Sequence, residues 1–246
     1  PQQKRNWYLQ FFLENNFYDA FIIHIDKTNK EIIKKFSEIT GIEERRYLED
    51  HQTNSDIGYL AAQEAIHNAK IDKEELDYII VAHNFGEVRK ENPQIDTIPS
   101  IASRVKRKLE IQNPYTVAHD IIFGCPGWIQ AMIQANYYIK SGDASKVLVI
   151  GSDTLSRLSD PYDRDGMIYS DGAGAVVLEA TESEKPVGIC SHKTRSDALE
   201  EAYYMWMGES FSPKKEGRQL YLKMNGRKIF EYAMKKVPQL VKDTLD

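Results

Sequence analysis

Cysteine is scarce in this sequence, and its scarcity limits both the fold and the compartment. The 246 residues contain two cysteines, Cys125 and Cys190. Two thiols cannot form the disulfide framework on which small secreted domains depend. We therefore expect the protein to fold around an apolar core in a reducing, cytoplasmic environment.

Long apolar runs and an excess of one charge are also absent. No run approaches the roughly 18 apolar residues of a membrane-spanning helix, so the sequence predicts no membrane partner. Lysine and arginine number 32 against 37 aspartates and glutamates, which gives a formal net charge of −5. A dedicated nucleic-acid-binding protein carries a basic excess, so no nucleic acid is expected as a partner. The sequence also shows no glycine-rich phosphate loop and no metal-ligand spacing.

The pattern of apolar residues predicts helices that alternate with short strands. Strands are predicted at 78–82, 115–122, 147–150, 173–179 and 187–192. Helices are predicted at 31–39, 54–68, 100–109, 126–141 and 226–246. In the helix at 54–68, the expected buried stripe holds Ile57, Leu60, Ala61 and Ala65. Strands that alternate with helices predict a parallel, doubly wound α/β sheet.

Two stretches of the sequence begin alike. Residues 54–82 predict a helix, a charged turn and a buried strand, and residues 225–246 begin in the same way and then end. A duplicated α/β unit would explain this pattern, with a second copy that lacks its later strands. The first residue is Pro1 rather than methionine. We therefore expect the chain to be a fragment of a longer protein.

The segment Phe123-Gly124-Cys125-Pro126-Gly127 is the sharpest chemical feature. It places a cysteine between a predicted strand and the start of a helix. Backbone N–H groups and the helix dipole there stabilise an anion, and therefore a thiolate or an oxyanion. The two glycines are expected to leave room for a substrate beside the sulfur. The alternative is a buried structural cysteine, the role that the strand-like context of Cys190 predicts for that residue.

The segment Asp120–Trp128 resembles the nucleophile segment of the ketoacyl-acyl carrier protein synthase III family, condensing enzymes of the thiolase fold. Further segments agree with the family in order and spacing: 40–46, 138–142, 149–153, 160–164, 171–175 and 222–226. The resemblance implies a layered α/β/α/β/α sandwich built from a duplicated half. Residues 1–185 would form the half with the nucleophile, and residues 186–246 would begin an incomplete second half.

The resemblance also implies an acyltransferase of fatty acid biosynthesis that uses no cofactor. Cys125 would accept an acyl group from a thioester, and the acyl-cysteine would condense with malonyl-acyl carrier protein as carbon dioxide is lost. The implied substrates and partners are acyl-CoA and the acyl carrier protein. A homodimer is expected through pairing of the strand at 115–122 across a two-fold axis.

Six further residues receive roles from the resemblance alone. Thr40, Arg164, Gly226 and Phe230 would bind the CoA substrate, with Arg164 at the nucleotide and the last two along the pantetheine tunnel. The acyl pocket would be shaped by Ile98, reaching across the dimer interface, and Tyr169. The simpler alternatives are an ion pair between Arg164 and a neighbouring aspartate, and ordinary core positions for the apolar residues. The basic run at 104–108 fits either an acidic carrier protein or a solvated helix face, and the solvated face is favoured.

The sequence also departs from the family. None of its six histidines stands in the family's His-Gln-Ala context, and the expected asparagine is missing as well. Lys35 and Ile39 replace a tryptophan and an arginine at the CoA mouth. The alternatives are therefore a resorcinol- or polyketide-type ketosynthase, a hydroxymethylglutaryl-CoA synthase relative, and a non-catalytic pairing subunit. The hydroxymethylglutaryl-CoA synthase reaction would need a carboxylic acid after the strand at 78–82, where only Glu87 is near.

Overall fold

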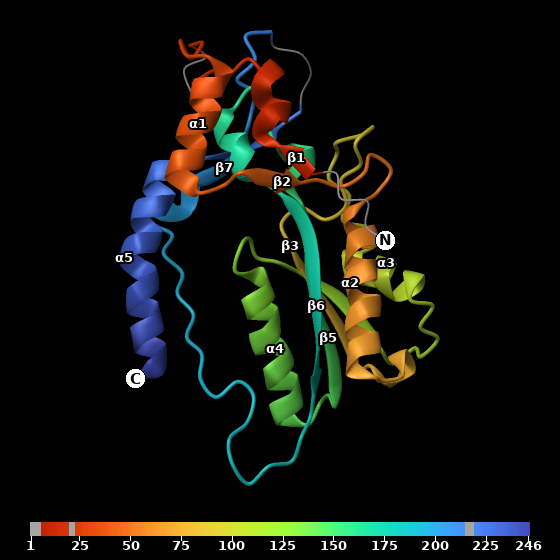
Figure 1. Ribbon diagram of the computed structural model, residues 1–246. Helices are drawn as coiled ribbons and strands as arrows, with labels where there is room; N and C mark the ends of the chain where they lie inside the picture. The colour runs from red at the N-terminus through yellow and green to blue at the C-terminus, as the bar shows by residue number, and fades with distance from the viewer. Residues whose placement is uncertain (1–5, 20–22, 215–218) are drawn as a thin grey trace. The chain divides into compact units, whose positions relative to one another are not determined.

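The chain divides into two units that are interleaved along the sequence. The computed structural model describes residues 6–19, 23–214 and 219–246 (Figure 1). One unit consists of Pro1–Tyr47, Leu155–Ser170 and Ser191–Asp246, and the other of Leu48–Thr154 and Asp171–Cys190. They are called unit 1 and unit 2 below. The boundary between residues 185 and 186 of a duplicated fold stays a prediction.

Unit 2 is built on a four-stranded sheet with the order β4-β3-β5-β6. Strand β3 (Tyr78–His83) lies between β4 (Val117–Ile122) and β5 (Lys146–Thr154) and runs parallel to both. Strand β6 (Asp171–Glu179) is antiparallel to β5, so the prediction of an all-parallel sheet is wrong at this edge. The residues between β5 and β6 supply no crossover helix within unit 2, and a parallel return to the same sheet requires such a crossover.

Helices cover both faces of this sheet (Figure 1). Helices α2 (Asn54–Ala69) and α3 (Ile101–Lys108) pack on one face, and α4 (Gly127–Ser141) packs on the other. Alternate residues of β3 point to opposite faces, so Ile79 and Val81 join the first core and Ile80 and Ala82 the second. The strand is apolar throughout because both of its faces are buried.

The buried face of α2 differs from the predicted one. Leu60 is 43% exposed, whereas the buried positions of the helix are Asn54, Ser55, Gly58 and Ala62. Two of these are polar residues that make hydrogen bonds in the interior, as described below. A pattern of apolar residues cannot identify polar core positions, and this explains the error.

The predicted strand at 187–192 is also wrong, because these residues form neither helix nor strand. A strand needs a neighbour that satisfies its backbone N–H and C=O groups. In the described part of the chain, no strand pairs with this segment. Cys190 is exposed, so its predicted place in the core is wrong as well.

The described residues of unit 1 form two α-helices and two small antiparallel sheets. Helix α1 spans Asn29–Thr40 and α5 spans Gly226–Leu245. The sheets pair β1 (Asn6–Tyr8) with β2 (Glu44–Arg46), and β7 (Met205–Gly208) with β8 (Tyr221–Met224). The 3₁₀ helices among the residues described in the two units are η1 (Leu9–Glu14), η2 (Lys73–Glu75), η3 (Leu155–Leu158), η4 (Arg164–Ile168) and η5 (Glu201–Tyr203).

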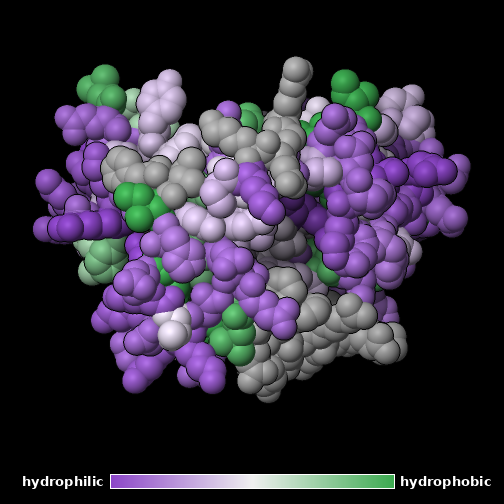
Figure 2. All heavy atoms as spheres, turned by 90° about the horizontal axis from the view of Figure 1, so that it is seen from above, coloured by the Kyte–Doolittle hydropathy of each residue, from purple (hydrophilic) through white to green (hydrophobic). Residues whose placement is uncertain are grey.

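The surfaces of the helices are largely polar. Seen from above, the molecule presents a mostly hydrophilic face on which hydrophobic side chains are scattered (Figure 2). The apolar stripe of α5 is open, since Phe230, Met234 and Val237 are each more than half exposed. Among the residues described, no helix combines the length and the apolar character needed to cross a membrane.

The two leucines Leu148 and Leu60 offer a matched test of this core. Leu148 is fully buried in β5, and we expect Leu148→Ala to lower the free energy of unfolding of the sheet unit by about 2–5 kcal/mol, because a cavity is left. Leu60→Ala, at an exposed site, should change it by only about 0.5 kcal/mol. Urea denaturation followed by far-ultraviolet circular dichroism compares the two variants. Equal losses would contradict the assignment of the core to the sheet.

Candidate active site

Cys125 lies in the turn between the end of β4 and the start of α4. Its side chain is exposed, so a buried structural role is excluded for this residue. Gly124 has a φ of +75°, a backbone conformation that glycine adopts without strain. The N–H of Gly127 donates to the Gly124 carbonyl at 3.0 Å and closes the turn. That N–H is therefore used inside the turn, and the anion-binding donors of the helix start are those that follow it.

Gly127 serves helix packing rather than the substrate space that the sequence predicted. A side-chain carbon added there would lie 3.3 Å from the Ala82 side chain and 3.4 Å from that of Phe123. The same holds for Gly151, where an added carbon would lie 3.1 Å from the Trp128 ring. The missing side chains let the first turn of α4 approach β3 and β5 closely. This close approach fixes the helix start beside Cys125.

A buried histidine ties the ends of β3 and β4 together. His83 is 1% exposed, and its Nε2 lies 2.9 Å from Oδ2 of Asp120. Its Nδ1 accepts the N–H of Gly86 at 2.9 Å, so the ring proton is on Nε2 and is donated to the carboxylate. Asp120 also accepts the N–H groups of Ile101 and Ala102, each at 2.7 Å, at the start of α3. This network holds β4 five residues before the cysteine.

A second pair ties β3 to β5. The backbone N–H of Asn84 donates to Oδ1 of Asp153 at 2.9 Å, and its side-chain amide donates to Oδ2 at 2.6 Å. Burial raises the pKa of Asp153, and the two hydrogen bonds from Asn84 oppose this shift. A side-chain carbon at Gly124 would lie 3.6 Å from the Asn84 Oδ1. The amide oxygen of Asn84 therefore lies beside the turn that carries Cys125.

The carboxylate that a hydroxymethylglutaryl-CoA synthase would need could come only from Glu87, and this side chain already makes hydrogen bonds and an ion pair. Glu87 is 4% exposed and accepts hydrogen bonds from the backbone N–H of Ser55 at 2.8 Å and from its hydroxyl at 2.9 Å. Arg104 pairs with Glu87 at 3.3 Å and with Asp96 at 2.8 Å. These contacts hold the Glu87 carboxylate at the start of α2. Glu87 thus joins the start of α2 to Arg104 of α3 and has a structural role.

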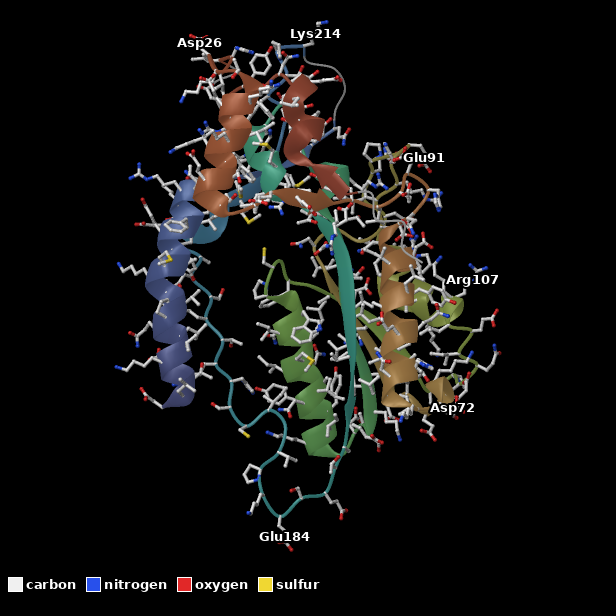
Figure 3. All side chains as sticks on the ribbon, in the orientation of Figure 1. Asp26, Asp72, Glu91, Arg107, Glu184 and Lys214 are labelled. Atoms are coloured by element: carbon white, nitrogen blue, oxygen red, sulfur yellow. The ribbon has the colours of Figure 1, made fainter. Side chains whose placement is uncertain are left out.

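Most basic side chains of the run at 104–108 on α3 already pair with groups of this chain. Besides Arg104, Lys106 donates to the carbonyls of Asn113 and Thr116, and Lys108 pairs with Asp56 at 2.6 Å. Arg107 points outward from the helix (Figure 3). One outward arginine does not make a basic docking surface. The structure therefore favours the solvated helix face over a carrier-protein contact at this run.

The residues predicted to contact CoA all lie in unit 1. Thr40 ends α1, where its hydroxyl donates to the Phe36 carbonyl at 2.7 Å and accepts the N–H of Ile42 at 3.2 Å. Arg164 begins η4 with a 58% exposed side chain, and its Nε lies 3.6 Å from the Asp165 carboxylate. The ion pair that the sequence offered as the simpler alternative is thus present, though long.

Gly226 and Phe230 occupy the first turns of α5. A side-chain carbon added to Gly226 would lie 3.6 Å from the Asp165 carboxylate, so the structure brings this glycine next to the Arg164 segment. Phe230 is 65% exposed, which is unusual for a large aromatic side chain. The structure thus places an exposed aromatic side chain about one turn along α5 from the glycine that lies next to Asp165.

The two residues that the resemblance assigns to an acyl pocket belong to different units. Ile98 lies in unit 2 and is 85% exposed, and Tyr169 lies in unit 1 and is 7% exposed. The predicted nucleophile, Cys125, belongs to unit 2 with Ile98. The roles of both pocket residues stay predictions.

The family model described as 3-Oxoacyl-[acyl-carrier-protein (ACP)] synthase III matches residues 119–198, which include the turn with Cys125. The Beta-ketoacyl-[acyl-carrier-protein] synthase III 1 of Vibrio vulnificus (strain YJ016) is 38% identical over 208 residues. This chain belongs to the 3-oxoacyl-[acyl-carrier-protein] synthase III family. The matched region is 84% of this chain and 61% of that relative, so the chain spans about three fifths of the length of the synthase III proteins that it matches.

Solved synthase III structures confirm the predicted thiolase-like α/β fold. The 3-oxoacyl-[acyl-carrier-protein] synthase III of Aquifex aeolicus matches with a TM-score of 0.69 and 30% identity, over 86% of this chain and 62% of that one. The Pseudomonas aeruginosa synthase III matches with a TM-score of 0.76 and 23% identity, over 98% of this chain and 66% of that one. The fold and the family predicted from the sequence are therefore both confirmed.

The two exposed cysteines provide an internal comparison for thiol reactivity. We expect iodoacetamide near neutral pH to alkylate Cys125 faster than Cys190, because Cys125 precedes a helix start that favours the thiolate and Cys190 lies in an irregular segment. Peptide mapping by mass spectrometry over a time course measures both rates. Since both thiols are exposed, accessibility alone would give similar rates. Equal or faster labelling of Cys190 would remove Cys125 from its proposed role.

Proposed function

We propose that this protein is a condensing enzyme of fatty acid biosynthesis that joins an acyl group from acyl-CoA to malonyl-acyl carrier protein. The observation that carries the proposal is the exposed Cys125 thiol at the start of α4, at the carboxyl edge of parallel strands. Ligand and catalytic sites of open α/β sheets are commonly built at this edge. The related Vibrio vulnificus protein carries the name of this reaction class. A cytoplasmic location stays a prediction.

In the proposed first step, the Cys125 thiolate attacks the carbonyl carbon of the acyl thioester. A bond from this carbon to the cysteine sulfur forms, and the bond to the CoA sulfur breaks. CoA leaves as a thiol with the proton that the cysteine lost. The dipole of α4 and the open N–H groups of its first turn stabilise the negative charge at the sulfur.

In the second step, the malonyl group loses carbon dioxide and the resulting carbanion attacks the acyl-cysteine. A carbon–carbon bond forms, the carbon–sulfur bond breaks and the Cys125 thiolate returns. The resemblance assigns stabilisation of the carbanion to a histidine and an asparagine in a context that none of the six histidines of this sequence shows. The residues present here therefore support acyl transfer more directly than condensation.

CoA is proposed to bind unit 1 through Arg164, Gly226 and Phe230. The exposed guanidinium of Arg164 suits a phosphate, and the open ring of Phe230 suits the apolar part of the pantetheine arm. Thr40 would act by shaping the end of α1, since its hydroxyl already makes two internal hydrogen bonds. Tyr169 and Ile98 keep their proposed places along the acyl group.

One alternative chemistry has support from the surface of α1. Ile39 is 71% exposed and the side chain of Lys35 is 68% exposed, at positions where the resemblance implies an arginine and a tryptophan. An altered CoA mouth favours a polyketide- or resorcinol-type ketosynthase as the second candidate. The hydroxymethylglutaryl-CoA synthase is disfavoured because Asn84 stands near the required carboxylate position and Glu87 is engaged with Ser55. The exposed Cys125 disfavours a non-catalytic pairing subunit.

The measurement that tests the proposed function follows acylation and condensation separately. We expect the 246-residue chain to become acylated at Cys125 by acyl-CoA, slowly, and to form no 3-oxoacyl product with malonyl-acyl carrier protein. A version extended by the segment with the family's histidine and asparagine should do both. Losing one preorganised oxyanion donor typically costs ~10²–10³ in rate, and two are missing here. The acyl adduct is read by intact mass and the product by chromatography.

Cys125→Ala in the extended version is the control and should abolish both steps. Condensation by the shorter chain at a rate close to that of the extended one would contradict the mechanism. Acylation that persists in Cys125→Ala would assign the nucleophile to another residue.

The edge strand β4 supports the proposed homodimer. It pairs with β3 on one side, and no other described strand lies along its second edge. Val117 and Ile122 in the strand are 47% and 63% exposed, and the flanking Tyr115 and Phe123 are 85% and 50% exposed. An open strand edge with apolar neighbours is usually closed by a second copy.

Sedimentation velocity at micromolar concentration should therefore show a dimer. Val117→Lys should shift the population to monomer, because it places a charge at the strand edge away from the Cys125 turn. Leu60→Lys on α2, a comparably exposed apolar site, should leave the dimer intact. A monomer in the unaltered chain, or equal effects of the two variants, would contradict the proposed interface.

A further inference from the structure

Lys223 in β8 is a buried lysine held by two buried aspartates. It is 1% exposed, and its ammonium group contacts the carboxylate of Asp160 and lies 3.3 Å from that of Asp163. The ammonium also lies 3.3 Å from the centre of the Phe211 ring. Asp160 and Asp163 are themselves 1% and 8% exposed. The ammonium group of Lys223 is therefore shielded from water, and so are the carboxylates with which it pairs.

Each aspartate also holds backbone of its surroundings. Asp160 accepts the N–H groups of Phe211 at 2.7 Å and Tyr162 at 3.1 Å. Asp163 accepts the N–H of Asp165 at 2.9 Å and so caps the first turn of η4. Burial raises the pKa of Asp163, and the charge of Lys223 opposes this shift. Lys223 thus pairs with two carboxylates that both accept backbone N–H groups.

Such a cluster needs an explanation other than stability. Taking these three charges out of water is costly, and well-packed apolar residues of the same volume are often equally stable. What a buried ion pair can supply is a fixed geometry between two segments. The question is therefore which segments Lys223 joins.

The two segments are those that carry the proposed CoA contacts. Residues 159–165 include Arg164, and residues 221–226 lead into Gly226 and Phe230. They lie side by side, since Ser159 and Leu222 form a parallel bridge and Gly226 packs beside Asp165. Lys223 lies between these two contacts and pairs with the first segment twice. All of these residues belong to unit 1.

We propose that Lys223 is a positioning residue for CoA, which sets Arg164 at the distance from Gly226 and Phe230 that one CoA molecule spans. The inference rests on the proposed function, because it assigns the nucleotide end to Arg164 and the pantetheine arm to α5. Without the lysine, the nucleotide end loses its support, whereas the pantetheine contacts on α5 remain.

The test compares CoA with pantetheine, which lacks the nucleotide and its phosphates. Asp163→Asn keeps the shape of the side chain and its capping oxygen but removes the charge that pairs with Lys223. Lys223→Met removes the lysine charge at similar length. Asp56→Asn is the matched control, because Asp56 pairs with a lysine, Lys108, in unit 2. Calorimetric titration of the 246-residue chain and its variants gives the dissociation constants.

We expect Asp163→Asn and Lys223→Met to weaken CoA binding about tenfold, below the ~10²-fold that a misplacement of about 1 Å can cost. Pantetheine binding and the rate of Cys125 alkylation should stay as in the unaltered chain, and Asp56→Asn should bind CoA normally. If Lys223→Met fails to fold, the isosteric Asp163→Asn still decides the question.

Unchanged CoA affinity in a folded Asp163→Asn variant would overturn the inference, and so would equal losses for CoA and pantetheine. The proposed function fails separately: an unaltered chain that binds neither compound would remove the CoA site and the role of Lys223 together. An unaltered chain that binds CoA, with variants that bind it equally well, leaves the proposed function standing and overturns the inference alone.

Discussion

The turn that carries Cys125 depends on two hydrogen-bonded pairs at the carboxyl ends of the parallel strands. His83 and Asp120 join the ends of β3 and β4, and Asn84 and Asp153 join β3 to β5. A chain that leaves a sheet loses its ladder partners there, so its polar groups need others. Because each pair crosses between neighbouring strands, it fixes where the next loop begins. An exposed thiol can then keep one position without being buried itself.

The sheet could be predicted from the sequence wherever burial alone decides the structure. The segments at 78–82 and 147–150 are apolar on both faces because helices cover both sides, and both form central strands. Burial does not determine direction, which is why β6 was expected to run parallel. Nor does it supply a partner, so the apolar segment at 187–192 stays irregular. Pairing depends on neighbours that a local pattern does not contain.

The residues of the candidate site likewise include some that a local pattern predicts and some that it misses. Cys125 could be found because a cysteine between glycines, next to a proline, marks a strand–helix junction. His83 was missed because the helix and strand patterns treat it as the end of an apolar run, although a buried polar residue must have a partner. The local pattern also could not predict that Cys125 belongs to one unit and that Arg164 and Gly226 belong to the other. Unit 1 is made of three separate segments of the chain, which a local pattern does not connect.

The acidic residues show how the charge of the chain serves its fold. Asp120 accepts N–H groups at the start of α3, Glu87 accepts the N–H of Ser55 in the first turn of α2, and Asp163 caps η4. In each case a carboxylate lies where a helix exposes unpaired donors and the positive end of its dipole. Lys223 provides the counter-charge for one of these caps and His83 a neutral donor for another. The acidic residues behind the net charge of −5 thus include several that fix helix starts, in unit 1 and in unit 2. A substitution at one of them would act on the position of a binding or catalytic group, even though none of them touches substrate in the proposed mechanism.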